Sequence, residues 1–174
     1  MGELDRIWAG WRSTYINQVS ADPAALGPDD DGRSLFERIL GSGLPDAETY
    51  VVWRGRHCAA LLNAYPYGSG HLLVLPQRAV ADLEQLDAEE STELWAAVQA
   101  AVVAVKAAYR TDGVNVGANL GSAAGAGVPD HLHVHVLPRW SADSNFITAI
   151  AEARVLPEPL DVTWQKLTEA WPAN

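Results

Sequence analysis

The sequence is poor in cysteine, in positive charge and in long apolar runs, and each shortage excludes a class of protein. Cys58 is the single cysteine among 174 residues, so no disulfide framework can form within the chain. Its setting in "HCAALL" indicates a core residue rather than a nucleophile. Lysine and arginine number 12 against 22 acidic residues, a net charge of −10, which argues against general nucleic-acid binding. No run of about 18 apolar residues and no signal peptide is visible, so we expect a cytoplasmic protein without a membrane segment.

The chain nevertheless has the apolar content of one compact domain, since 48 % of its residues are hydrophobic. Residues 1–33 predict a helical extension followed by a loop rich in Pro, Gly and Asp; the expected helix rests on the spacing of Leu4, Ile7, Trp8, Trp11 and Tyr15. Ser34 and Glu37 form a capping box for a short helix that "GSG" at 41–43 ends. The tail, 146–174, predicts a short helix after Pro157 and Pro159.

Between these segments the pattern predicts strands gathered around one long helix. Strand patterns occupy 49–54, 57–63, 71–77, 113–120 and the histidine segment that follows. Asp87 and Glu90 form a capping box for a helix that runs to about Arg110. Its expected buried stripe is Leu94, Val98, Val102, Val105 and Tyr109. This arrangement indicates an α+β fold with an antiparallel sheet.

The stretch "DHLHVHVLPRW", residues 130–140, has three histidines at alternate positions and is the main candidate for a functional site. His131, His133 and His135 alternate with aliphatic residues, so a strand would place all three imidazoles on one face. A solvated face with three histidines by accident is improbable, because imidazole is neither a favoured strand residue nor a good core residue.

Two kinds of site remain open from the residues alone. Histidines two apart on a strand can bind one zinc ion, with Asp130 or His71 as a further ligand. Alternatively, one histidine attacks phosphorus while its neighbours assist. The Gly-rich stretch "GSAAGAGVPD" before the strand favours the second, because glycine lets backbone N–H groups approach an anion. Ser122 and the N–H groups of Gly125 to Gly127 would then bind phosphate, with His131 and Arg139 near for charge.

"HLHVHVLPRW", "LLNAYPYGSGHLLVLPQR" and "NVGANLG" together resemble the histidine triad superfamily, in the order that its members show. The resemblance covers roughly residues 34–145, which we take as the domain. The start "RIWAGWR" and the stretch "RWSADSNFIT" are similar to actinobacterial members that resemble diadenosine tetraphosphate phosphorylases.

The resemblance implies a five-stranded antiparallel sheet, a homodimer or higher homo-oligomer, and a nucleotide pocket. It makes His133 the nucleophile on the α-phosphorus, puts His131 and His135 at the phosphate oxygens and leaving group, and makes His71 a support. The residues implied near the nucleotide are Asn63 at the ribose, Asn119 near the phosphates, and Leu35, Phe36, Ile39 and Leu61 around the base. Phe36, Ile39 and Leu61 could instead be plain core, Asn63 could begin a turn, and His71 could be a capping or core histidine. Trp140 could stack on a base, and Asp143 and Asn145 could meet a second nucleotide or a partner subunit.

Two positions depart from the family pattern. Many relatives carry a Cys-x-φ-Cys half-site for structural zinc where this chain has Ser34 and Glu37, so we expect no structural zinc. Relatives often carry Ser or Gln where this chain has Gly127, so a backbone N–H would have to replace that phosphate contact. No cofactor is expected to be required, and Mg²⁺ would enter only as a counter-ion of the nucleotide.

The sequence therefore predicts an enzyme that transfers the nucleotidyl group of an adenosine nucleotide through a nucleotidyl-histidine, with phosphorolysis of diadenosine tetraphosphate as the main reading. The alternatives are a diadenosine polyphosphate or phosphoramidate hydrolase, a metal hydrolase, and a nucleotide-binding protein with little turnover.

Overall fold

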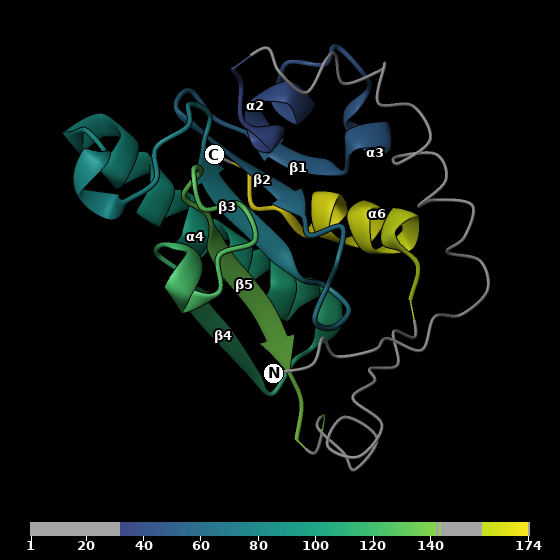
Figure 1. The fold of residues 1–174 in the computed structure, drawn as a ribbon. Coiled ribbons are helices and arrows are strands. Elements are labelled where there is room, and N and C mark those ends of the chain that lie inside the picture. Colours follow the sequence, from purple (N-terminus) through teal and green to yellow (C-terminus); the bar gives the residue numbers. More distant parts are fainter. Residues whose placement is uncertain (1–31, 142, 144–157, 174) are drawn as a thin grey trace.

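The structure is a computed structural model that describes residues 32–141, 143 and 158–173. Its centre is a five-stranded sheet in the order β1-β2-β3-β5-β4, antiparallel throughout (Figure 1). The strands are β1 (Val51–Arg54), β2 (Cys58–Leu62), β3 (Leu72–Pro76), β4 (Gly113–Ala118) and β5 (Val134–Arg139). The predicted α+β class and all five strands are confirmed, with ends shifted by up to four residues.

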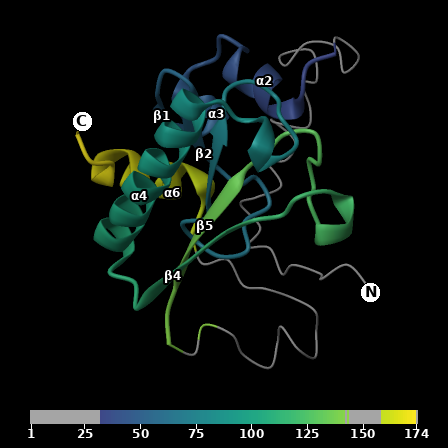
Figure 2. The ribbon, with the colours of Figure 1, turned by 90° about the vertical axis from the view of Figure 1, so that its left-hand side faces the viewer.

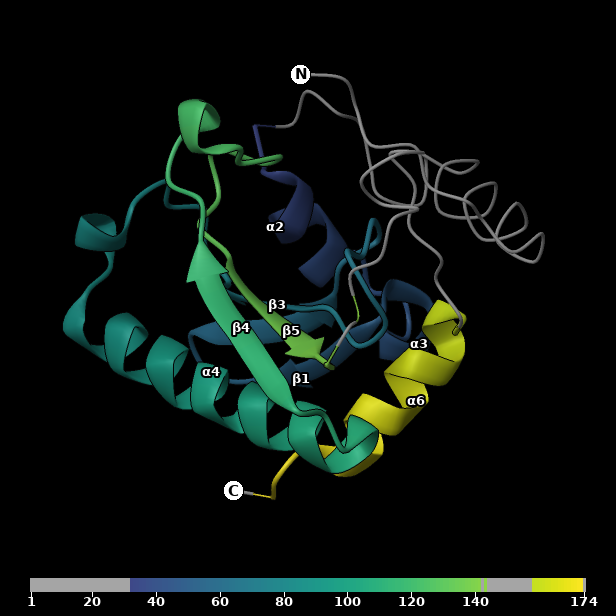
Figure 3. The same ribbon diagram turned by 90° about the horizontal axis from the view of Figure 1, so that it is seen from below.

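Helices cover both faces of this sheet. The long helix α4 (Ala88–Tyr109) lies across one face, and α6 (Leu160–Ala170) packs beside it against β1. The short helix α2 (Leu35–Leu40) lies on the other side, as the turned views show (Figures 2 and 3). Helix α3 (Asp46–Thr49) directly precedes β1 and contacts it. Three of these helices are confirmed predictions; α3 was not predicted. The predicted N-terminal helix lies outside the described residues.

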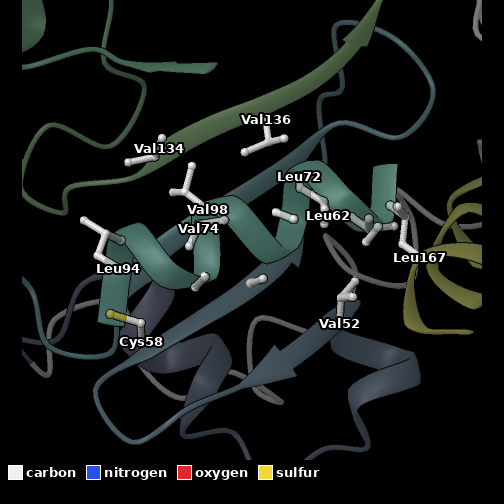
Figure 4. Close-up of a cluster of buried hydrophobic side chains, with 14 of the residues drawn as sticks. Val52, Cys58, Leu62, Leu72, Val74, Leu94, Val98, Val134, Val136 and Leu167 are labelled. Carbon is white, nitrogen blue, oxygen red and sulfur yellow. The ribbon is translucent and has the colours of Figure 1, made fainter. Parts of the chain in front are cut away.

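Two hydrophobic clusters lie on opposite faces of the sheet. The larger joins α4 to the sheet and includes Leu94, Val98, Val134, Val136 and Cys58 (Figure 4). The smaller lies under α2, where Phe36 packs with Val51, Leu61, Leu73 and Leu75. Cys58 is fully buried, and burial raises the pKa of its thiol to about 12, so its predicted role as a core residue is confirmed.

The long helix begins as predicted, with a complete capping box between Asp87 and Glu90. Leu94, Val98 and Val105 are buried, whereas Val102 and Tyr109 are only partly buried. Small residues complete the stripe, because Ala97, Ala101 and Ala104 let the helix approach the sheet closely. Among the described residues, no helix is both long and apolar enough to cross a lipid bilayer.

Candidate active site

The histidine segment is extended, but only part of it belongs to the sheet. The strand ladder begins at Val134, so His131 and His133 precede it. Leu132, Val134 and Val136 nevertheless point into the α4 cluster. The histidines point the other way, toward α2, where the ring of Phe36 meets His131 and His133 edge-on at centroid distances of 5.2 and 5.4 Å. The shared face is confirmed, although a ladder spanning all three histidines is not observed.

The ring of His133 is oriented by the main chain of its own segment. Its Nδ1 lies 2.8 Å from the carbonyl oxygen of His131. A carbonyl only accepts, so Nδ1 carries the proton and the lone pair is on Nε2. That Nε2 has no hydrogen-bond partner among the residues that the structure describes. The main chain thus selects the tautomer of His133 in which Nε2 carries the lone pair and can act as a nucleophile.

His71 and His135 form a second oriented pair. The backbone N–H of Tyr67 donates to Nδ1 of His71 over 3.0 Å, which puts the proton of His71 on Nε2. That N–H lies 2.9 Å from Nδ1 of His135, so His135 must carry its own proton on Nε2. Nε2 of His135 is buried and finds no partner in the described parts of the chain. The ring centroids of His135 and His133 are 5.0 Å apart, so His135 presents a hydrogen-bond donor beside the nucleophile.

His131 differs from the role that the resemblance implies. It is fully buried, and both ring nitrogens already have protein partners, Ser34 Oγ at 2.6 Å and the Pro76 carbonyl at 2.7 Å. Neither nitrogen is left for a phosphate oxygen. In this structure His131 supports its neighbours through these two bonds, and a direct contact with phosphate stays a prediction.

Two histidines of the cluster are kept uncharged by their surroundings. Burial is the main cause that lowers the pKa of His131, and burial followed by the neighbouring His133 lowers the pKa of His135 to about 4. Both therefore remain uncharged at neutral pH. His135 therefore offers the reaction an N–H donor rather than a fixed positive charge.

Most of the residues expected around the base pack in or against the smaller cluster, and the residue expected at the ribose lies in a turn. Phe36 and Leu61 are buried in the smaller cluster, Ile39 packs against that cluster, and Leu35 remains 38 % exposed at the start of α2. Asn63 is a turn residue, since its Oδ1 accepts the N–H of Tyr65 at 2.9 Å, and its Nδ2 lies 3.5 Å from Nδ1 of His71.

The loop between β4 and β5 leads directly into the histidine segment. Ala118 pairs with Val134, so Asn119 follows at the level of His133. Gly125 adopts φ +91° and its N–H is bound to the Ser122 carbonyl, so that N–H is engaged in the turn and not in the predicted anion site. Gly127 is open, with no atom within 4 Å of the position of a β-carbon.

The far end of β5 does not join the site. Arg139 and Trp140 lie six and seven residues beyond His133, roughly 20 Å along an extended chain. Arg139 pairs with Asp143 at 2.5 Å, and the ring of Trp140 meets that of Tyr109. The expected charge from Arg139 near the phosphates and the stacking of Trp140 on a base are therefore not supported by this geometry. Asn145 lies outside the described residues.

Two contacts were missed by sequence reasoning. The ring of Tyr67 stacks on His135 at 5.7 Å while its N–H orients His71, and Ser34 binds His131 as well as capping α2. The turn "AYPYGSGH" gave a weak signal for the Tyr67 contact, because Tyr67 precedes His71 by four positions. Nothing in the sequence pairs residues 34 and 131.

Comparison with known proteins agrees with this geometry. The family model of the HIT domain matches residues 45–142. The chain is 41 % identical to the AP-4-A phosphorylase of Mycobacterium tuberculosis over 97 % of its own length and 85 % of the relative's. It is 39 % identical to the asymmetrical bis(5'-nucleosyl)-tetraphosphatase of Schizosaccharomyces pombe, over 53 % and 50 % of the two lengths.

The fold is also similar to those of solved histidine triad proteins. A HIT-like protein of Bartonella henselae superposes with a TM-score of 0.64 at 26 % identity, covering 80 % of this chain and 98 % of that one. A zinc-bound histidine triad protein of Mycobacterium smegmatis also gives 0.64 at 26 % identity, covering 79 % and 92 %. With its five-stranded sheet and its three alternating histidines, this chain belongs to the HIT-domain family.

Proposed function

We propose that the protein transfers the adenylyl group of a diadenosine polyphosphate, with His133 as the nucleophile. The observation that carries the proposal is the hydrogen bond from His133 Nδ1–H to the His131 carbonyl, which leaves the Nε2 lone pair free. The substrate class is supported by the names of the relatives, a phosphorylase of AP-4-A and a tetraphosphatase of bis(5'-nucleosyl) compounds.

In the first step, Nε2 of His133 forms a bond to the α-phosphorus while the bond from phosphorus to the leaving oxygen breaks. The leaving nucleotide departs as a phosphate anion, and the N–H of His135 donates a hydrogen bond to the oxygen on which charge develops. No proton has to leave His133, because its Nδ1–H stays on the His131 carbonyl. The adenylyl-imidazole is then cationic, which makes His133 a good leaving group in the second step.

In the second step, we propose inorganic phosphate as the acceptor. The loop that leads into the histidine segment supports this choice, because the backbone at Gly127 is open and Ser122 carries an exposed hydroxyl. The tetraphosphatase among the relatives supports hydrolysis as the second candidate.

The test resolves the products of diadenosine tetraphosphate with and without phosphate. Phosphorolysis gives ADP and ATP, whereas hydrolysis gives AMP and ATP at every phosphate concentration. If no adenylyl-histidine can be trapped under either condition, the whole proposal is wrong.

We further propose that the protein works without bound zinc and as a homodimer. Ser34 and Glu37, which stand at the cysteine positions of many relatives, are engaged in hydrogen bonds to His131 and to the Ala79 N–H. Trp95 and Val103 are about half exposed on α4, and Val116 is 44 % exposed on β4 at the edge of the sheet. Such exposed apolar residues favour a protein partner. Sedimentation of wild type against Trp95→Asp tests this: an unchanged mass would refute a contact through α4.

A further inference from the structure

Ser34 links the start of α2 to the histidine segment across 97 positions of sequence. Its Oγ accepts the N–H of Glu37 at 3.2 Å, which caps the helix. The same Oγ lies 2.6 Å from Nδ1 of His131. A hydroxyl both donates and accepts, so one Ser34 side chain can make both bonds at once.

The direction of the second bond follows from the other side of the His131 ring. Nε2 of His131 lies 2.7 Å from the carbonyl oxygen of Pro76 and must donate to it. The imidazole is fully buried and neutral, so its single proton is on Nε2. Nδ1 can then only accept, and the Ser34 hydroxyl donates to it. Ser34 and Pro76 together fix both the plane and the tautomer of His131.

His131 passes this constraint to the nucleophile through its main chain. The His131 carbonyl accepts Nδ1–H of His133 at 2.8 Å, the bond that leaves Nε2 of His133 free. Because the strand ladder begins only at Val134, ladder hydrogen bonds do not hold this carbonyl. The peptide group of this carbonyl is held on one side by the Leu132 N–H, which donates to the Val80 carbonyl at 2.6 Å. The side-chain bonds of His131 fix it on the other side.

The start of α2 is itself fixed at two further points. The carboxylate of Glu37 accepts the N–H groups of Ser34 and Ala79, at 2.9 and 3.0 Å. The ring of Phe36 packs edge-on against His131 and His133. Ser34 is thus held against the histidines by polar bonds on one side and aromatic contact on the other.

We propose that Ser34 is a positioning residue for the nucleophile: its hydroxyl holds His131, whose carbonyl in turn sets the tautomer of His133. The proposal rests on the proposed function of His133. It separates two roles of one side chain, because capping α2 needs only the acceptor lone pair of Oγ, whereas positioning His131 needs its proton.

Three substitutions separate these roles. Ser34→Ala removes both, while Ser34→Gly removes the hydroxyl but still caps a helix almost as well as Ser. Ser34→Thr keeps both. Asp87→Ala is the matched control, because it removes the N-cap of a capping box from α4, away from the histidines.

The rate of adenylyl-histidine formation should fall at least tenfold in both Ser34→Ala and Ser34→Gly and recover mostly in Ser34→Thr. Asp87→Ala should form the intermediate at the wild-type rate. A wild-type rate in Ser34→Gly, or an equal loss in Asp87→Ala, would overturn the proposal.

Nitrogen NMR of the histidine rings supplies the second readout. In the wild type, His131 should be protonated on Nε2 and His133 on Nδ1; in Ser34→Gly the signals of both should shift toward a mixture of tautomers. Wild-type His131 protonated on Nδ1 would overturn the proposal even if the Ser34 variants do not fold. If the wild type forms no adenylyl-histidine, the proposed function fails, whereas the ring signals still decide whether Ser34 orients His131.

Discussion

Mild acid should destabilise the protein through His135 before the carboxylates titrate. Burial, followed by the neighbouring His133, lowers the pKa of His135 from 6.5 to about 4. Between these values the unfolded chain binds more protons than the folded one, so the free energy of unfolding falls as the pH falls. Going from about pH 7.5 to about pH 5, this difference integrates to about 2 kcal/mol. Because His135 is partly exposed, screening reduces the expected loss to about 1–2 kcal/mol.

Urea unfolding followed by tryptophan fluorescence, at both pH values, measures this loss. The comparison is with His135→Gln, which should lose correspondingly less stability over the same interval, whatever its absolute stability. His131, whose pKa is also lowered chiefly by burial, acts with the same sign and remains in both proteins. Glu37, Glu90 and Glu158 have pKa values below 4.5, so they contribute little above about pH 5. An identical change in wild type and variant would refute the buried neutral state of His135.

Three further outcomes are expected. His133→Ala should abolish turnover and the adenylyl-enzyme while circular dichroism and nucleotide binding persist, because no other imidazole in the described cluster has its Nε2 lone pair free; normal turnover would contradict the mechanism. Gly127→Ser should lower KM for phosphate roughly tenfold, the gain of one hydrogen bond to a charged group, since a β-carbon there meets nothing within 4 Å; an unchanged KM would remove this loop from the acceptor site. A zinc-selective chelator should leave turnover intact in excess Mg²⁺, whereas loss of activity with stoichiometric zinc in the purified protein would favour a metal site.

Local patterns predicted the secondary structure well. The capping boxes at Ser34–Glu37 and Asp87–Glu90 both form, because each depends on residues three positions apart. The alternation from Leu132 to Val136 correctly assigned the two faces of the histidine segment. The strand itself begins later than expected, since the length of a ladder depends on its partner, and β3 pairs only as far as Val134.

The interior of the site depended on contacts that no local pattern encodes. The position of His131 suggested a phosphate ligand, but its partners come from α2 and from the end of β3. Trp140 follows the histidines closely in sequence, yet an extended chain carries it to the opposite end of the sheet. Proximity in sequence was a poor guide here because a strand moves away by about 3.3 Å with each residue.

The packing at the start of β5 limits how the reactive histidine can move. His133 lies outside the ladder, while Leu132 and Val134 on either side of it are buried against α4. Because both neighbours are fixed in the core, movement toward phosphorus falls to the side chain of His133 rather than to its backbone. The reactive histidine is thus placed by the same buried residues that hold the sheet against α4, so substitutions at Leu132 or Val134 should alter the chemistry and the stability together.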